Sequence, residues 1–301
     1  MWQLAFAAAA IAVIALIAYS RHIERRAKRR RKLRPDGIVV GAEPIVLERK
    51  DAPGVLLLHG AGDTPQVLSG LAAYLHERGY SVRVPLLSGH GRALTSFGAV
   101  TAMEWHEDAA RAFAEMRSDH GWVSVVGLSM GGALATSLAS REHGIQTLVL
   151  LVPYLAMPTA VRVAAISSRA WGWVCPYFAS GGRRSNRDPI AAANGLGYGI
   201  FTPKALRALY EIVVEGWDAL PSVKAPTLVI QSREDNRIST TNANGAFARL
   251  GSTEKKLVWI EGAAHVITVD YGHERVCEIT AEWLEKHSQL FAGGSARAKG
   301  P

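Results

Sequence analysis

The chain has 301 residues, of which 49% are hydrophobic and 20% charged, a globular composition that excludes global disorder. Its two cysteines exclude a disulfide scaffold and a cysteine-rich metal site. The net charge of +8 is concentrated in residues 21–34, which hold nine basic residues and one acidic residue, so the balanced remainder has no basic face and we expect no nucleic-acid partner.

The first residues predict a membrane anchor. The segment from Trp2 to Tyr19 is apolar except for Gln3. As a helix, this segment rises about 27 Å, close to the roughly 30 Å thickness of the hydrocarbon core of a bilayer. Trp2 and Tyr19 then lie at opposite ends, where amphipathic aromatic side chains prefer to lie. We therefore expect residues 1–20 to form one transmembrane helix.

The basic segment after the apolar run predicts the orientation of this anchor. A cleaved signal peptide, the alternative, normally carries its charges before the apolar stretch, whereas here they come after it. By the positive-inside rule, residues 21–34 and the body that follows stay in the cytoplasm. We expect a single-pass membrane protein with a cytoplasmic body. The basic run either attracts anionic head groups or serves as a stop-transfer flank without lipid specificity.

The body of the chain alternates strands and helices. Residues 21–53 are expected to form the basic juxtamembrane segment, a linker and an edge hairpin with strands at 38–40 and 45–47. Further along, unbroken apolar runs suit strands that are buried on both faces, as in a parallel sheet. The remaining strands are expected at 55–58, 81–84, 123–126, 147–152, 227–231 and 257–260, and the core helices at 65–78, 103–117, 131–140 and 275–285. This alternation predicts an α/β protein with a mostly parallel, doubly wound sheet.

The alternation stops between residues 154 and 221, which have no strand-like run. This segment has several aromatic residues, a polar loop at 180–188 and a helix near 203–217. We therefore expect a helical cap inserted over one end of the sheet. The core then comprises residues 54–153 and 222–290, and residues 291–301 are expected to form a flexible tail.

The central motif is Gly127-Leu128-Ser129-Met130-Gly131-Gly132, between a strand and a helix rich in small residues. A sharp strand-to-helix turn of this kind holds its serine in a strained conformation with the hydroxyl exposed above the sheet. The flanking glycines are required because side chains would clash in so tight a turn. The N-terminus of the following helix adds free N–H groups and a positive dipole end. The motif therefore predicts Ser129 as a catalytic nucleophile.

A serine hydroxyl needs a base, and the base needs an orienting acid. On this kind of sheet, the three follow in the order serine, acid, histidine. His265 follows the strand at 257–260, and two candidate acids, Asp235 and Glu234, follow the strand at 227–231. Both loops lie at carboxyl ends of strands, where open α/β sheets place their ligand sites. We therefore expect His265 to be the base.

The tetrahedral intermediate of acyl transfer needs two N–H donors. The backbone N–H of Met130, the residue after the nucleophile, is expected to be one of them. The second is expected in the loop after the first buried strand, at Ala61 or, alternatively, at Gly62. His59 and His90 are expected to shape this region rather than to act as bases.

The other reactive side chains are expected to be structural. Cys175 and Cys277 have no visible base partner and are expected to be packing residues. Asp270 and His273 are expected to form local hydrogen bonds. The sequence has no metal-ligand spacing and no Gly-rich phosphate loop after the first strand, so we expect neither a metal nor a cofactor.

These motifs, taken in order, resemble the α/β-hydrolase superfamily, and within it the bacterial carboxylesterases and monoacylglycerol lipases. The resemblance spans residues 54–285 outside most of the insertion. It rests on the segments GVLLLHG, PLLSGHG, EWHED, VVGLSMGG, PTLVIQSRED and GAAHVITVD. It implies the α/β-hydrolase fold with a helical cap.

The resemblance also implies roles for single residues. The implied triad falls on Ser129, Asp235 and His265. The family pattern thereby favours Asp235 over Glu234 as the acid. The implied oxyanion donors are the backbone N–H groups of Ala61 and Met130.

The activity that the resemblance implies is hydrolysis of carboxylic esters through an acyl-enzyme. We expect the substrate to be a small-molecule or lipid ester, and the predicted membrane anchor is consistent with a lipid-derived ester such as a monoacylglycerol. The same triad can serve a thioesterase, an acyltransferase, an amidase or a perhydrolase. A catalytically silent membrane scaffold or binding module is the remaining alternative.

Overall fold

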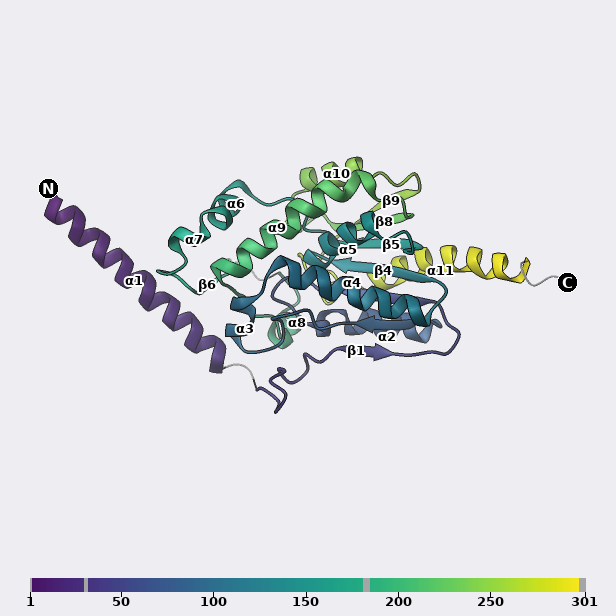
Figure 1. Cartoon of the computed structure of the whole chain (residues 1–301), viewed down its shortest axis with the longest axis horizontal. Helices are drawn as coiled ribbons and strands as arrows, with labels where there is room; N and C mark the ends of the chain where they lie inside the picture. The colour runs from purple at the N-terminus through teal and green to yellow at the C-terminus, as the bar shows by residue number, and fades with distance from the viewer. Residues whose placement is uncertain (1, 30–31, 181–184, 298–301) are drawn as a thin grey trace.

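The computed structural model describes residues 2–29, 32–180 and 185–297. Within these residues, the centre is a seven-stranded sheet in the order β1-β3-β2-β4-β5-β8-β9 (Figure 1). Neighbouring strands are parallel, except that β1 is antiparallel to β3. The strands are β1 (Ile45–Leu47), β2 (Gly54–Leu58), β3 (Ser81–Val84), β4 (Val123–Leu128), β5 (Thr147–Leu151), β8 (Thr227–Ser232) and β9 (Lys255–Ile260). The expected mostly parallel sheet is confirmed.

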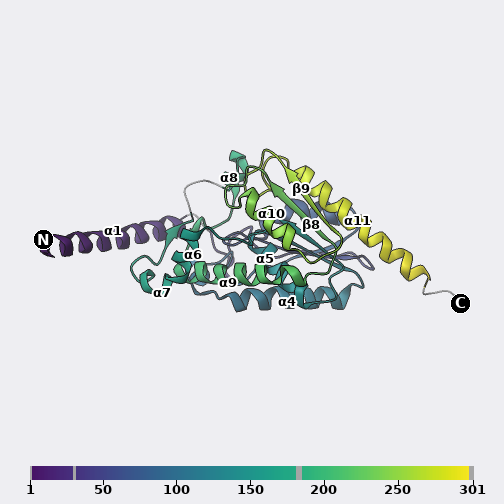
Figure 2. The same cartoon turned by 90° about the horizontal axis from the view of Figure 1, so that it is seen from above.

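Helices cover both faces of this sheet (Figures 1 and 2). Outside the cap they are α2 (Ser69–Glu77), α3 (Leu94–Ala99), α4 (Ala102–Asp119), α5 (Met130–Arg141), α10 (Thr240–Arg249) and α11 (His273–Arg297). Helix α1 (Trp2–Arg29) covers neither face and extends away from the sheet. The first turn of the helix predicted at 65–78 is a separate 3-10 helix over Pro65–Leu68. This arrangement is the doubly wound layering that the sequence predicts.

Strand β2 explains why the core has two halves. Leu56 and Leu58 belong to a hydrophobic cluster with residues of α4, α5 and α9 (Pro203–Ala219). Val55 and Leu57 belong to a second cluster with residues of α2 and α11. Because successive side chains of a strand point to opposite faces, an unbroken apolar strand can serve both clusters. Such a strand is held rigidly, and it fixes the loop that follows its carboxyl end.

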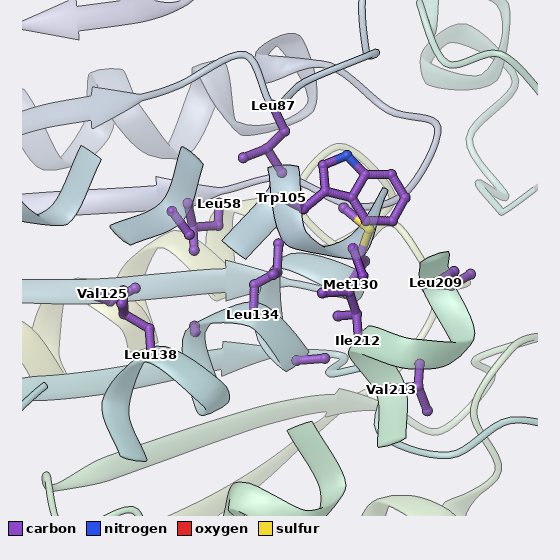
Figure 3. Packing of buried hydrophobic residues seen from close by; sticks show 14 of the residues in the cluster. Leu58, Leu87, Trp105, Val125, Met130, Leu134, Leu138, Leu209, Ile212 and Val213 are labelled. Atoms are coloured by element: carbon purple, nitrogen blue, oxygen red, sulfur yellow. The ribbon is translucent and has the colours of Figure 1, made fainter. Parts of the chain in front are cut away.

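Helix α5 begins beside the first cluster. Figure 3 shows Met130, its first residue, among Trp105 of α4 and Leu209 and Ile212 of α9. All four side chains are buried. The start of α5 is therefore fixed by packing from two neighbouring helices.

The expected cap, residues 154–221, contains more than helices. Its helices are α6 (Thr159–Ile166), α7 (Ser168–Trp171), α8 (Pro189–Asn194) and α9. It also has two short strands, β6 (Phe178–Ala179) and β7 (Ile200–Phe201), which pair antiparallel. Strands of two residues are too short to leave a periodic pattern in the sequence. Because α9 packs along α5, the last part of the cap belongs to the main core.

The expected edge hairpin between residues 38–40 and 45–47 does not form. Strand β1 pairs with β3 instead, and Val39 forms only an isolated bridge with Leu33. Gly37 and Gly41 have φ angles of 78° and 87°, so the backbone turns on both sides of the short apolar run. The run therefore has no length over which to pair as a strand.

Both ends of the chain are more helical than expected. Helix α1 continues through Arg29, so much of the basic segment extends the apolar helix without a break. Helix α11 continues through Arg297, so residues 291–297, expected in a flexible tail, are helical. Residues 298–301 of that expected tail lie outside the described residues.

Among the described residues, one helix is long and apolar enough to cross a membrane. This stretch is Phe6–Ala27, with a mean hydropathy of 1.8. Near the N-terminus of α1, the side chains of Trp2 and Phe6 are 91% and 80% exposed. Further along, the Ser20 hydroxyl accepts a hydrogen bond from the backbone N–H of Tyr177 at 2.9 Å. The helix is thus a candidate span that is joined to the cap (Figure 1).

Candidate active site

Ser129 stands at the turn between β4 and α5 in a strained conformation. Its φ of 55° and ψ of −115° lie in a region that residues with a side chain seldom adopt. The glycines of the motif make the turn possible. A Cβ on Gly127 would overlap the backbone of Gly131, and a Cβ on Gly131 would overlap the carbonyl group of Leu58. The strain therefore presents the Ser129 hydroxyl at the end of the sheet, as expected for a nucleophile elbow.

Three side chains from distant parts of the chain form one hydrogen-bonded chain. Nε2 of His265 lies 2.8 Å from Oγ of Ser129. Nδ1 of the same ring lies 2.9 Å from Oδ2 of Asp235 and 3.1 Å from Oδ1. Because an ionised carboxylate can only accept, Nδ1 carries the proton and Nε2 is free to accept the serine proton. This geometry is the one expected of a nucleophile, a base and an orienting acid.

Asp235 is held as a charged acceptor. Its Oδ1 accepts from the backbone N–H groups of Arg237 and Ile238, and its Oδ2 accepts from the side-chain amide of Gln231. Burial favours the neutral acid, but the His265 ring and the backbone N–H groups outweigh burial and lower the pKa of Asp235 below its ordinary value. The carboxylate therefore stays ionised beside the ring.

The structure separates Glu234 from the base. Its carboxylate accepts from the backbone N–H of Gly262 at 3.1 Å, and the residue is exposed. Asp235, in contrast, has a fully buried side chain against His265. Of the two candidate acids that follow β8, only Asp235 contacts the histidine ring.

The loop after β2 lies against the nucleophile. A Cβ on Gly60 would lie 3.4 Å from Cβ of Ser129, so Ala61 follows a residue in close approach to the elbow. Gly62, the alternative oxyanion donor, gives its N–H to Nε2 of His90 at 2.9 Å. Among the described residues, neither the N–H of Ala61 nor that of Met130 has a hydrogen-bond acceptor. These two donors are available to a substrate oxygen, whereas that of Gly62 is engaged.

His59 and His90 hold the loop that follows β2 in place. Nε2 of His59 accepts from the backbone N–H of Leu87, and Nδ1 donates to the carbonyl of Gly60. Burial lowers the pKa of His59 to about 4 and that of His90 well below its ordinary value, so both rings are neutral. A ring whose two nitrogens are both engaged has neither the position nor the free lone pair of a base.

Asp63 and Arg237 were not singled out from the sequence. Burial raises the pKa of Asp63 to about 6, although the charges of His265 and Arg237 oppose this rise. The Arg237 guanidinium donates to the carbonyl of Ser180 and to the hydroxyl of Ser185, both in the cap. Asp63 therefore lies close enough to His265 and Arg237 for their charges to act on it. The only signal in the sequence was position, since each residue lies two places from a predicted site residue.

The remaining candidates are structural. The thiols of Cys175 and Cys277 are buried and free, and burial raises the pKa of Cys277 to about 11. Across the described part of the chain, no group of three His, Cys, Asp or Glu side chains is placed to hold a metal ion.

Comparison with known proteins shows the family of the chain. Residues 50–271 match the Hydrolase_4 family, described as serine aminopeptidase, S33. The match spans most of the chain, and the chain belongs to this family of α/β-hydrolases. Among curated proteins, it is 28% identical to the thermostable monoacylglycerol lipase of Bacillus sp. (strain H-257) over 252 residues, which cover 83% of this chain and 97% of the relative. It is likewise 28% identical to a carboxylesterase of Bacillus subtilis (strain 168), with 82% and 98% covered.

Solved structures give the same class. One from work on the metagenome-derived lipolytic enzymes LipS and LipT superimposes with a TM-score of 0.76 at 29% identity, covering 85% of this chain and all of the other. The monoacylglycerol lipase of Paleococcus ferrophilus has a TM-score of 0.71 at 21% identity, covering 81% and 98%, and supports the fold. The protein is a serine ester hydrolase.

Proposed function

We propose that this enzyme is a membrane-anchored hydrolase of lipid-derived carboxylic esters that uses Ser129, His265 and Asp235 as its catalytic triad. The observation that carries the proposal is the continuous hydrogen-bonded chain from the serine hydroxyl to the buried carboxylate. The strained backbone of Ser129 supports the same role, since strain of this kind is found at nucleophile elbows.

The proposed reaction passes through an acyl-enzyme. His265 takes the hydroxyl proton of Ser129 as the oxygen attacks the ester carbonyl, and Asp235 stabilises the imidazolium that forms. The backbone N–H groups of Ala61 and Met130 bind the oxyanion of the tetrahedral intermediate. His265 then donates its proton to the leaving alcohol. A water molecule, activated by the same ring, hydrolyses the acyl-enzyme and releases the carboxylic acid.

The similarity to a monoacylglycerol lipase and the apolar helix α1 both favour a lipid substrate. Helix α1 would hold the enzyme where amphipathic esters concentrate. Its basic C-terminal half follows the apolar half, which by the positive-inside rule leaves the catalytic domain in the cytoplasm. Extraction of membranes with alkaline carbonate should leave the full chain in the pellet. Release into the supernatant would contradict the anchor.

The activity is tested with the full chain in detergent micelles. p-Nitrophenyl esters from C2 to C16 should be hydrolysed by the wild type, with an optimum at longer acyl chains, and monoacylglycerol should be cleaved. Ser129→Ala should be near background and should no longer react with a fluorophosphonate probe. An acyl-CoA substrate, tested in parallel, separates an ester hydrolase from a thioesterase. If wild type and Ser129→Ala hydrolyse every ester equally slowly, the proposed triad is wrong.

A further inference from the structure

Asp270 is a buried carboxylate five residues after His265, and the reaction described above does not use it. Within the described residues, the hydrogen bonds that its carboxylate oxygens accept all come from backbone N–H groups. Its Oδ2 accepts from Ala264 at 2.6 Å, and its Oδ1 accepts from Tyr271 at 2.9 Å. Ala264 immediately precedes the candidate base. One side of the carboxylate therefore holds the loop on which His265 stands.

The other side of the same carboxylate holds the cap. Oδ1 accepts from the backbone N–H of Asp188 at 2.8 Å, and both oxygens accept from that of Arg187 at 2.9 Å. Burial favours the neutral acid, yet these N–H groups and that of Ala264 outweigh it and lower the pKa of Asp270 below its ordinary value. A charged acceptor thus joins two segments that lie more than seventy residues apart in the chain.

The same cap segment makes a second contact with the His265 loop. The carbonyl oxygen of Ser185 accepts from the backbone N–H of His265 at 3.0 Å and from that of Val266 at 2.9 Å. The Ser185 hydroxyl accepts from the guanidinium of Arg237, whose own backbone N–H donates to Asp235. Residues 185–188 are therefore bonded to the loops of both the base and the acid.

We propose that Asp270 is a positioning residue of the triad, which fastens cap residues 187 and 188 to the His265 loop and so sets the distance from His265 to Ser129. This inference rests on the proposed function. It adds that residues 185–188 of the cap stay hydrogen-bonded to the His265 loop during the reaction. They are not part of a lid that moves away from the active site. Small displacements of a catalytic group are costly, since about 1 Å can cost about a hundredfold in rate.

The test compares Asp270→Asn with a matched destabilising control in the full-length enzyme. The asparagine keeps one acceptor oxygen but turns an NH₂ group toward backbone N–H donors. It therefore loses the hydrogen bonds either to the cap or to the His265 loop. Thr147→Val is the control, because Thr147 is buried at the start of β5 and accepts from the indole of Trp283. It lies at the opposite end of its strand from the active site. Its loss lowers stability without touching the base.

We expect Asp270→Asn to lower kcat per active site, titrated with a fluorophosphonate, by about 10- to 100-fold with little change in KM. The downfield proton resonance of the His265 Nδ1–H should shift or broaden in this variant. Thr147→Val should lower Tm and leave kcat per titrated site and the resonance unchanged. A kcat for Asp270→Asn within about twofold of the wild type would overturn the proposal.

A conservative variant keeps the test decisive if Asp270→Asn does not fold. Asp270→Glu keeps the charge and both acceptor oxygens but moves them by one methylene, and it should show an intermediate loss of kcat. An unchanged kcat for this variant would also overturn the proposal. Failure of the proposed function is distinct, because the wild type itself would then neither hydrolyse esters nor react with the phosphonate.

Discussion

The backbone N–H of Gly62 donates to Nε2 of His90 across 2.9 Å, so this N–H is not free to bind a substrate oxygen. Nδ1 of the same ring lies 3.1 Å from the carbonyl of Ser88, to which it donates. The ring can hold both partners only while it is neutral, because protonation would convert Nε2 from an acceptor into a donor. The loop that carries Ala61 therefore depends on a histidine that stays uncharged.

The two buried histidines predict a loss of stability in mild acid. Because burial lowers the pKa of His59 from 6.5 to about 4, the unfolded chain takes up a proton that the folded chain does not. The free energy of unfolding should therefore fall as the pH drops from 6.5 toward 4, by roughly 3 kcal/mol for His59 alone, and level off below. Urea unfolding across this range measures the effect. The slope should be shallower in His59→Asn, and an equal slope would contradict the assignment.

The buried carboxyl of Asp63 predicts an effect on catalysis that appears only at a pH above its pKa. Its pKa of about 6 means that the carboxyl is neutral at pH 5 and ionised at pH 8. The ionised form attracts the imidazolium that develops on His265 during attack. Asp63→Asn should lower kcat/KM by about threefold or more at pH 8 and have little effect at pH 5. Asp51→Asn, on an exposed turn, serves as the control and should behave as the wild type at both pH values.

The separation of the two acids predicts opposite outcomes for two adjacent substitutions. Asp235→Asn keeps the shape of the side chain but presents an amide to Nδ1 of His265, which favours the wrong tautomer, so kcat should fall by about 10³- to 10⁴-fold. Glu234→Gln should keep kcat within about threefold, because within the described residues this side chain accepts a hydrogen bond from the N–H of Gly262 and does not contact His265. Steady-state kinetics on one ester decide between them. A larger loss in Glu234→Gln would reverse the assignment of the acid.

The crowding at the elbow predicts a contrast between two glycines. A Cβ on Gly131 would overlap the backbone of Leu58, whereas a Cβ on Gly70, in α2, meets nothing within 4 Å. Gly131→Ala should therefore distort the elbow and remove most activity, with a clear drop in Tm. Gly70→Ala should raise stability by about 0.5–1 kcal/mol, since alanine is the better helix former. Thermal unfolding of both variants measures the contrast, and similar Tm changes would argue against a crowded elbow.

Much of the fold could be predicted because its signals are local. The apolar β2, the apolar residues 148–151 of β5 and the small residues after Ser129 are typical of buried parallel strands and a tight strand-to-helix turn. The loops after β8 and β9 hold the candidate acid and the histidine in the expected order. The predicted hairpin between residues 38–40 and 45–47 was wrong, because a run of three apolar residues does not indicate which strand it will pair with. The edge of β3 accepted β1 instead. Pairing across distant segments is decided by the assembled sheet.

The contacts around the triad could not be predicted for the same reason. Asp270 reads as a polar residue near a helix start, and nothing in its neighbours points to Arg187 and Asp188 as partners. Their bonds are made by backbone N–H groups, which every residue except proline carries. Ser185 likewise contacts the His265 loop through its carbonyl oxygen. Roles of this kind depend on position in space and leave no mark on residue type.

Helix α1 is a continuous helix that contacts the cap directly, not a flexible tether. Its helix runs unbroken from Trp2 through Arg29, and Tyr19 and Ser20 each accept a backbone N–H from the cap segment at β6 (Figure 2). In a bilayer, such an enzyme would neither tumble nor swing about its attachment. If α1 spans the bilayer as proposed, the enzyme would diffuse in the plane of the membrane, and the contacts of α1 with the cap would fix the orientation of the cap relative to the membrane.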